Sequence, residues 1–421
     1  MRIYIEPHGC SLSYGEAELM RQLAEEIGFE QVANESEADV LVLHTCAVIE
    51  STERKMYTRI EKLKGLGKPF VVSGCLASIA GNKITELAPE SVILPAQELE
   101  KFKNILETFT SANLMQAPKQ RRKEISAVIP IATGCLGSCS FCITRIARGE
   151  LRSKAVEYVL RQAHLALERG ARELRLAAQD TACYGMDIGS SLPELVSKIA
   201  ALEYEFRLRI GMMNVNTAIP ILQKLISCYN SEKVYKFLHL PLQSGSQSIL
   251  YKMARNYSIE DFMKIVAEFR RNFPNLTLST DLIVGFPGET EEDHRTTVSL
   301  IKALKPDIVN IKAFSPRANT KAFNLKPRVN SKVVKARTNE LSELRLRISK
   351  ENFEKYVGSE QRILVTERGK HNTFVGRTSC YKPVVLKESV ALGKFVHTKI
   401  TKAESTYLLG ELANFTTQAK I

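Results

Sequence analysis

The chain has 421 residues, of which 44% are hydrophobic and 25% are charged, a balance typical of an ordinary globular protein with two or three domains. No apolar run approaches the roughly 18 residues that a membrane-spanning helix needs, and the start resembles a strand rather than a secretory signal, so we expect a cytoplasmic protein without membrane contact. The net charge is +13, and nearly all of the excess lies in residues 317–421, which indicates a polyanionic partner such as RNA. From charge alone, a basic surface without a partner is an equally good interpretation.

The first hundred residues alternate between strand and helix patterns. Short apolar runs predict strands at Arg2–Glu6, Asp39–His44 and Pro69–Gly74. Amphipathic patterns predict helices between them, at Glu16–Ile27 and Thr52–Gly65. This alternation is typical of a parallel sheet covered by helices, so we expect an N-terminal α/β domain at residues 1–112. The polar and basic segment 113–123 that follows is interpreted as a linker.

Residues 125–352 show a second and longer alternation. Six apolar runs predict strands at Val128–Ala132, Glu173–Ala178, Arg207–Met212, Phe237–Leu242, Leu278–Val284 and Ile308–Ala313. Helical patterns separate these runs, at Ala155–Arg169, Leu192–Ala201, Ala218–Ser227, Ile259–Asn272 and Glu291–Leu304. The series predicts a partial (β/α)6 barrel of the TIM type, and a basic helix is expected at Ser331–Glu354.

The last part of the chain, residues 355–418, changes character again. Short β-rich runs are divided by Gly, Lys and Pro, at Gln361–Glu367, Asn372–Ser379, Val384–Leu386, Lys394–Lys402 and Thr406–Leu412. This pattern predicts a small, closed, all-β barrel, an architecture that often binds nucleic acid.

Three cysteines form a C-x3-C-x2-C pattern directly after the first strand of the predicted half-barrel: Cys135, Cys139 and Cys142. Loops after the strands carry the chemistry in barrels of this type. Three thiolates at this spacing can hold three irons of a cubic iron–sulfur cluster, with the fourth iron open for a small ligand. Structural zinc is the alternative, but such sites use four ligands, and no fourth Cys or His lies near this loop in the sequence.

A second set of cysteines, Cys10, Cys46 and Cys75, is spread over the N-terminal part, each residue just after a predicted strand. The carboxyl ends of parallel strands meet at one edge of a sheet, so we expect the three thiols to lie together there. Three thiolates again suggest a cluster with one open iron. Independent burial of each thiol is the alternative, and it is common for any single cysteine.

Three cysteines remain outside these sets. We interpret Cys228 and Cys380 as packing or surface thiols, and we leave the role of Cys183 open because it follows a barrel strand.

Polar residues at other predicted strand ends suit a ligand. Gln179 and Asp180 end the second barrel strand and could bind a charged amino group, although such residues often only cap loops. Arg145 and Arg148 follow the cysteine loop and could pair with a carboxylate or a phosphate, unless they lie in water at a helix start. The glycines of segment 285–288 suit a tight turn or a close approach to a ligand.

The motifs resemble those of the radical S-adenosylmethionine methylthiotransferases along essentially the whole chain. In the N-terminal part the similarity lies in GC at 9–10, HTCAVIEST at 44–52 and SGCLA at 73–77. In the barrel it lies in TGCLGSCSFC, HLPLQSGSQSIL, TDLIVGFPGETEED and FSPR. The family combines an N-terminal methylthiotransferase domain, a radical S-adenosylmethionine barrel and a C-terminal TRAM barrel. The segments ARGELRS, AQDTACYGMD and RIGMMNVN resemble its archaeal and eukaryotic branch, which adds a methylthio group at C2 of N6-threonylcarbamoyladenosine beside the anticodon of tRNA.

The resemblance implies roles for the barrel residues. Cys135, Cys139 and Cys142 would hold a [4Fe-4S] cluster that binds S-adenosylmethionine through its open iron. Gln179 and Asp180 stand where the family contacts the amino end of that cofactor.

The resemblance also implies a second [4Fe-4S] cluster in the N-terminal part, whose open iron carries the sulfur to be transferred, with the ligands Cys10, Cys46 and Cys75. The basic C-terminal part would hold tRNA mainly through its phosphates. An electron-donor protein, which the sequence does not identify, is the other expected partner.

Three positions depart from the family pattern. Ser13 stands where Asn is frequent, Ala182–Cys183 replaces a small residue and a glycine, and Ala318–Asn319 replaces Pro–Gly. None of them removes a cysteine of either set, so the expected reaction class is unchanged.

A radical mechanism suits the expected substrate, because the adenine C2–H bond is not acidic and carries no leaving group. We expect one S-adenosylmethionine to methylate the sulfur and a second to start functionalisation of C2, with the two clusters facing each other across the substrate. One alternative is a methylthiotransferase that modifies a ribosomal protein side chain; the basic C-terminal part and the branch-like segments favour tRNA. Another is a non-catalytic RNA-binding metalloprotein with zinc in the cysteine sites.

Overall fold

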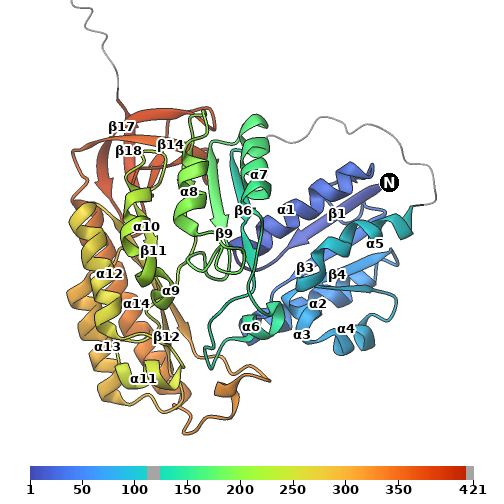
Figure 1. The fold of residues 1–421 in the computed structure, drawn as a ribbon, viewed down its shortest axis with the longest axis horizontal. Helices are drawn as coiled ribbons and strands as arrows, with labels where there is room; N and C mark the ends of the chain where they lie inside the picture. Colours follow the sequence, from blue (N-terminus) through green and yellow to red (C-terminus); the bar gives the residue numbers. More distant parts are fainter. Residues whose placement is uncertain (111–123, 414–421) are drawn as a thin grey trace, which may run out of the picture.

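The computed structural model describes residues 1–110 and 124–413. In chain order the protein consists of a sheet covered by helices, an open half-barrel and a small closed barrel (Figure 1). The predicted linker 113–123 and residues 414–418 of the predicted C-terminal barrel lie outside the described residues. Among the described helices, none has the length and apolar character needed to cross a bilayer.

The N-terminal part is a five-stranded parallel sheet in the order β2-β1-β3-β4-β5. Its strands are β1 (Arg2–Pro7), β2 (Glu30–Gln31), β3 (Val40–Thr45), β4 (Phe70–Gly74) and β5 (Val92–Pro95). Its helices are α1 (Ser11–Glu26), α2 (Glu50–Lys64), α3 (Cys75–Ile79), α4 (Gly81–Leu87), the 3-10 helix η1 (Ala96–Lys101) and α5 (Phe102–Phe109). Every residue of β3 and β4 is buried, as expected for a parallel sheet covered on both faces.

Two apolar cores flank this sheet. One joins the sheet to α1 and α5 through side chains such as Ile5, Met20 and Leu106. The other joins it to α2 and α4 through side chains such as Leu41 and Ile60. The α/β prediction is therefore confirmed, whereas β2, β5 and the helices after residue 75 are not predicted, because they are too short to show a hydrophobic period.

The half-barrel has six parallel strands in two sheets, β10-β9-β6 and β11-β12-β13, which meet at a bridge between Leu208 and Val234. The strands are β6 (Ser126–Pro130), β9 (Glu173–Ala177), β10 (Arg207–Arg209), β11 (Phe237–His239), β12 (Thr277–Val284) and β13 (Ile308–Ala313). The covering helices are α7 (Val156–Glu168), α8 (Leu192–Ala200), α10 (Leu222–Tyr229), α12 (Ile259–Asn272) and α13 (Glu291–Leu304). The predicted partial (β/α)6 barrel is confirmed.

Short elements connect these units. They are β7 (Ala132–Thr133), α6 (Ile143–Arg148), β8 (Arg152–Ser153), α9 (Val215–Ala218), η2 (Ile219–Ile221), α11 (Gln247–Lys252) and η3 (Lys321–Asn324). Strands β10 and β11 are shorter than predicted. After the carboxyl ends of these two strands, isolated backbone hydrogen bonds replace the regular ladder. One example is the bond from the Met213 N–H to the His239 oxygen at 3.0 Å.

A long helix, α14 (Ser331–Glu354), leads into the C-terminal barrel. The barrel closes in the order β14-β15-β16-β18-β17. Its strands are β14 (Glu360–Arg368), β15 (Phe374–Arg377), β16 (Pro383–Leu386), β17 (Phe395–Ala403) and β18 (Leu408–Leu412), so the predicted closed all-β barrel is confirmed.

The C-terminal barrel docks at the amino ends of the half-barrel strands. The buried Lys382 forms an ion pair of 2.6 Å with Asp307, just before β13, and Lys236, just before β11, donates its N–H to the Ser379 oxygen at 2.9 Å. The cysteine loop follows the carboxyl end of β6. The two features therefore lie at opposite ends of the half-barrel (Figure 1).

Candidate metal centres

The cysteine loop of the half-barrel lies between β7 and α6; we call its three cysteines, Cys135, Cys139 and Cys142, the barrel site. Gly134 has a φ of +78°, and a Cβ there would lie 1.8 Å from the Glu150 carbonyl oxygen, so only glycine fits. At the far side, Ser140 donates its N–H to Met253 at 2.9 Å and its carbonyl oxygen accepts from Ala322 at 2.7 Å. The loop is thus anchored to the barrel at both ends.

The sulfur atoms of the barrel site have different partners. Gly137 donates its N–H to the Cys135 sulfur at 3.2 Å, and the buried Arg255 donates Nη1–H to the Cys139 sulfur at 3.1 Å. Burial raises the pKa of Cys135 to about 11 and also raises the pKa of Cys142. Cysteine binds metal as a thiolate. A cation must therefore replace the proton that these buried thiols otherwise keep.

Asp180, which the sequence suggests as a cofactor contact, is buried beside the barrel site. Its carboxylate accepts four hydrogen bonds of 2.7–3.0 Å, from the N–H groups of Ala182 and Asn214, the Asn214 amide and the Thr217 hydroxyl. These donors use the lone-pair positions of the carboxylate. Because the Asn214 amide also lies 4.0 Å from the Cys135 sulfur, the geometry favours a positioning role for Asp180 over a direct cofactor contact.

Gln179 differs from its neighbour. Its side-chain Oε1 is buried and has no hydrogen-bond partner within the part of the chain that the structure describes. A buried acceptor without a partner is costly. This oxygen is therefore suited to accept from a ligand donor such as an ammonium group.

Cys10, Cys46 and Cys75 follow β1, β3 and β4, and we call them the N-terminal site. The three loops touch. A Cβ on Gly9 would lie 3.2 Å from the Cys46 Cβ, and a Cβ on Gly74 would lie 2.5 Å from the Thr45 oxygen. The structure brings the three loops together at the carboxyl edge of the sheet, while the meeting of the three thiols and their role as cluster ligands stay predictions.

Neither cysteine site has the geometry of a single-ion site among the described residues. Within residues 1–110 and 124–413, no three His, Cys, Asp or Glu side chains converge closely enough to hold a single metal ion. In a cubic cluster each thiolate binds a different iron, so the ligands need not converge on one point. The two cysteine sets are therefore compatible with clusters.

Arg148, the last residue of α6, reaches from the half-barrel into the N-terminal site. Its side chain is buried, its Nε–H donates to the Cys75 sulfur at 3.3 Å, and both of its terminal nitrogens donate to the carboxylate of Glu16 in α1. Burial would raise the pKa of Glu16, but Arg148 and His44 together lower it to about 2. The expected pairing of Arg148 with a carboxylate is confirmed, and the solvated alternative is wrong for this residue.

Arg145, the other arginine after the cysteine loop, is half-exposed. It donates to the carbonyl oxygen of Cys135 and lies 3.6 Å from the Glu150 carboxylate. Arg145 therefore supports the loop rather than the N-terminal site.

The N-terminal domain contacts both edges of the open half-barrel. At the first strand, α1 packs against β6, where a Cβ on Gly15 would lie 2.9 Å from the Pro130 and Val128 side chains. At the last strand, Glu53 of α2 pairs with Arg317, which follows β13. The N-terminal domain therefore spans the opening of the barrel and holds its own cysteines near the barrel site.

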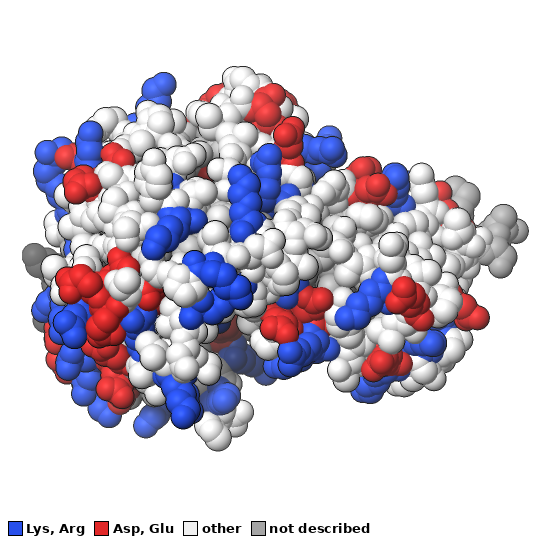
Figure 2. Space-filling view, turned by 90° about the horizontal axis from the view of Figure 1, so that it is seen from below, with Lys and Arg blue, Asp and Glu red and all other residues white. Residues whose placement is uncertain are grey.

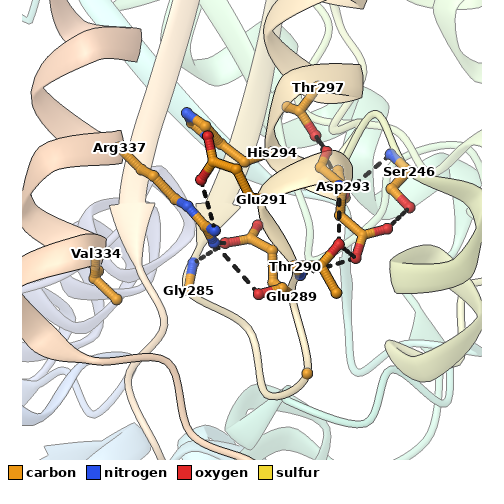
Figure 3. Close-up of polar contacts among 12 residues, drawn as sticks. Ser246, Gly285, Glu289, Thr290, Glu291, Asp293, His294, Thr297, Val334 and Arg337 are labelled. Atoms are coloured by element: carbon orange, nitrogen blue, oxygen red, sulfur yellow. Dashed lines mark hydrogen bonds and ion pairs between the residues drawn. The ribbon is translucent and has the colours of Figure 1, made fainter.

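The loop after β12 supports the barrel site through a buried ion pair (Figure 3). The Glu289 carboxylate accepts from the Gly285 N–H and from Arg337 of α14, each at 2.8 Å. In the same loop, the ring of Phe286 meets Phe141, which lies between Cys139 and Cys142, edge-to-face with centroids 6.5 Å apart. Arg337 and Glu289 are missed by sequence reasoning; the only signal for them is the glutamate that follows the two glycines of GFPGE.

The remaining cysteines pack in the interior. Cys183 is fully buried and donates to the Asp180 oxygen at 3.1 Å, and Cys228 donates to the Pro193 oxygen at 3.2 Å. Cys380 is also buried, near the docking surface of the C-terminal barrel. We interpret all three as packing residues.

Comparison with known proteins gives three family matches. Residues 2–95 match the family described as "Uncharacterized protein family UPF0004", residues 129–301 the "Radical SAM superfamily" and residues 354–413 the "TRAM domain". A probable threonylcarbamoyladenosine tRNA methylthiotransferase of Pyrococcus horikoshii is 40% identical over 98% of this chain and 99% of its own. The threonylcarbamoyladenosine tRNA methylthiotransferase of Homo sapiens is 31% identical over 97% of this chain and 74% of its own.

Among solved structures, a radical S-adenosylmethionine methyltransferase from Kitasatospora setae, with cobalamin and a [4Fe-4S] cluster bound, superposes with a TM-score of 0.57. The identity is 14%, and 76% of each chain is covered, so this likeness concerns the fold alone.

Proposed function

The chain belongs to the family of threonylcarbamoyladenosine tRNA methylthiotransferases, which are radical S-adenosylmethionine enzymes, and we propose that it adds a methylthio group at C2 of N6-threonylcarbamoyladenosine next to the anticodon of tRNA. Membership of the radical S-adenosylmethionine superfamily implies a [4Fe-4S] cluster and S-adenosylmethionine. The observation that carries the proposal is the position of the two cysteine sites, which the docked N-terminal domain holds at the same end of the half-barrel.

In the barrel site, we propose that Cys135, Cys139 and Cys142 hold the cluster. The partnerless acceptor of Gln179 serves the amino group of S-adenosylmethionine, and Asp180 positions Asn214 beside the loop. When bound, the cluster and S-adenosylmethionine supply the radical chemistry that an unactivated C–H bond requires.

In the N-terminal site, Cys10, Cys46 and Cys75 hold a second [4Fe-4S] cluster on this proposal. The support is the meeting of their three loops at one sheet edge and the positive charge of Arg148 beside the Cys75 sulfur. Burial outweighs the effect of Arg148 and raises the pKa of Cys75 to about 11, so this residue needs the cationic iron–sulfur core as a partner to bind as a thiolate.

The RNA-binding part of the proposal rests on the C-terminal barrel and on the surface charge. The barrel docks at the amino ends of the strands, whereas the site lies at their carboxyl ends, so the substrate must extend along the half-barrel. Figure 2 shows Lys and Arg side chains gathered in the middle of the face seen from below, the side on which α6 and α11 lie in Figure 1. An extended polyanion such as tRNA suits both features.

We propose domain limits of 1–112, 125–352 and 355–418, which the family matches at 2–95, 129–301 and 354–413 support. The proposal includes a cytoplasmic location, where tRNA is available, and an electron-donor protein that reduces the clusters.

The test is mass analysis of nucleosides from tRNA of a strain that lacks the gene, with and without complementation. The methylthio form of threonylcarbamoyladenosine is expected to disappear and to return with the wild-type gene. An unchanged nucleoside profile together with a lost methylthio group on a ribosomal protein would reject the proposal in favour of the protein substrate. Purified protein that contains zinc instead of iron would support the non-catalytic RNA-binding metalloprotein.

A further inference from the structure

Each cysteine site has one buried arginine that donates to one of its sulfur atoms, but the two arginines differ in origin. Arg255 and its partner Cys139 both belong to the half-barrel, with a distance of 3.1 Å. Arg148 belongs to the half-barrel, while its partner Cys75 belongs to the N-terminal domain, with a distance of 3.3 Å. We propose that Arg148 is a positioning residue that raises the reduction potential of the cluster in the N-terminal site. This inference rests on the proposed function, because it requires the second cluster.

The burial of Arg148 argues for a dedicated role. Its side chain is 1% exposed, and its charge is balanced by Glu16, which is also buried and accepts a further contact of 3.1 Å from His44. Burying an ion pair costs desolvation free energy that its attraction seldom exceeds. A pair of this kind adds little stability over apolar side chains of the same size, so a role at the adjacent sulfur accounts better for its presence.

The shape of the guanidinium group suits this position. The Nε–H points to the Cys75 sulfur while the two terminal nitrogens hold the two oxygens of Glu16. Lysine has one nitrogen at the end of a flexible stem and cannot make this set of contacts. The site is therefore specific for arginine rather than for any positive charge.

Helix α6 delivers Arg148 to this place. Cys142, a residue of the barrel site, is the N-cap of α6, and Arg148 is its last residue. Six residues of helix span about 9 Å. Ala147 packs in the apolar core of the N-terminal domain and accepts a hydrogen bond of 3.2 Å from Gln97. One short helix thus carries a residue of one site at its start and the sulfur partner of the other site at its end.

The sign of the effect follows from electrostatics. Hydrogen bonds to ligand sulfur and nearby positive charge favour the reduced, more negative cluster and so raise its potential. Removing the Arg148 donor therefore lowers the potential of the N-terminal cluster. Removing the negative charge of Glu16, while keeping its shape, leaves the arginine charge uncompensated and raises the potential. A merely structural role does not predict shifts of opposite sign.

The experiment is a redox titration, followed by electron paramagnetic resonance, of full-length protein reconstituted anaerobically with iron and sulfide. The variants are Arg148→Lys, Glu16→Gln and, as the matched control in the barrel site, Arg255→Lys. Iron content is measured on every sample. A full-length variant in which Cys135, Cys139 and Cys142 are replaced by alanine identifies the signal of the N-terminal cluster.

The expected result is a lower potential of the N-terminal cluster in Arg148→Lys, a higher one in Glu16→Gln, and no change of that cluster in Arg255→Lys, which moves only the barrel cluster. Unchanged potentials, or shifts of the same sign in both N-terminal variants, would overturn the proposal. If the Arg148→Lys variant does not load the N-terminal cluster, the Glu16→Gln variant tests the proposal alone: a higher potential supports it, and a lower or unchanged potential overturns it. Loss of that iron from both variants would show that the pair only builds the site. Wild-type protein without a second cluster would instead refute the proposed function.

Discussion

The two cysteine sites of this protein are chemically alike but are built in different ways. The barrel site lies in one loop of eight residues from Cys135 to Cys142, which follows the closely packed Gly134 and is hydrogen-bonded to the half-barrel through Ser140. The N-terminal site takes one cysteine from each of three strand ends, and the neighbour of its Cys75 sulfur, Arg148, comes from another domain. A local site needs only its loop and the surface below it, whereas a dispersed site needs the sheet order and the docking of two domains.

The difference has a consequence for stability. The barrel site depends on contacts within the half-barrel, such as Arg255 on the Cys139 sulfur. The N-terminal site also depends on the interface between the domains, because Arg148 reaches Glu16 of α1 only when α6 packs against α3 and η1. We therefore expect changes at this interface to affect the N-terminal site first.

Removal of all ligands of one site gives the largest expected effect. Alanine at the three cysteines of either site should remove about four of about eight irons and abolish methylthio transfer to tRNA. Only the barrel variant should also lose cleavage of S-adenosylmethionine. Iron analysis, product analysis of S-adenosylmethionine and nucleoside mass analysis check this. An N-terminal variant that keeps all of its iron would contradict the assignment of the second site.

Replacing the glycine that precedes a cysteine by alanine should reduce the iron of that site and leave the iron of the other site unchanged. Gly134→Ala should reduce barrel iron, because its Cβ would lie 1.8 Å from the Glu150 oxygen, and Gly74→Ala should reduce N-terminal iron, because its Cβ would lie 2.5 Å from the Thr45 oxygen. The strained backbone alone costs about 1–3 kcal/mol. Gly67→Ala is the matched control, since its φ is +61° but nothing lies within 4 Å. Iron loss in that control would show that backbone strain, and not the steric clash, causes the iron loss in the other two variants.

The ion pair behind the barrel site should contribute to global stability as well as to the loop. Arg337→Met leaves Glu289 buried without its charged partner and should lower the free energy of unfolding by about 3–5 kcal/mol. The exposed pair of Arg295 with Glu291 is the control, and Arg295→Ala should cost less than about 1 kcal/mol. Denaturant unfolding measures both. Equal effects of the two changes would argue against a supporting role of the α14 contact.

A smaller effect is expected from pH at the domain interface. The pKa of Glu16 is lowered from 4.5 to about 2, because Arg148 and His44 outweigh its burial. The unfolded chain therefore takes up this proton at a higher pH than the folded chain. The stabilisation is present above pH 4.5 and is lost as the pH falls toward 2.

From neutral pH to about pH 3 the expected loss is about 2 kcal/mol in the cluster-free protein. Unfolding curves across this range, with Glu16→Gln as the variant that lacks the titrating group, measure it. A variant with the same acid sensitivity as the wild type would show that other carboxylates control the acid response.

The fold follows from the sequence wherever an element is long enough to show its hydrophobic period. The six barrel strands, the long helix α14 and the closed C-terminal barrel are all predicted, and their ends differ by a few residues. Short helices and strands are not predicted, because a hydrophobic period is recognisable only over several repeats. Helix α6, with six residues, is the important omission, since it places Arg148.

The candidate sites show the same division. The six cysteines are recognisable from their spacing and from their places after strands. Asp180 illustrates the limit of this reasoning: its position at a strand end is evident, but only the structure shows four protein donors around its carboxylate. Glu16 and Arg255 carry no local signal at all.

The sequence by itself determined the order of the three domains, the two cysteine sets and the basic character of the C-terminal part, because these depend on neighbours along the chain. Only the tertiary structure decided which arginine meets which sulfur. Arg148 and Glu16 are 132 residues apart, and Arg255 and Cys139 are 116 residues apart. Such pairs form through the packing of whole elements, and a buried charge becomes tolerable only when that packing supplies its partner.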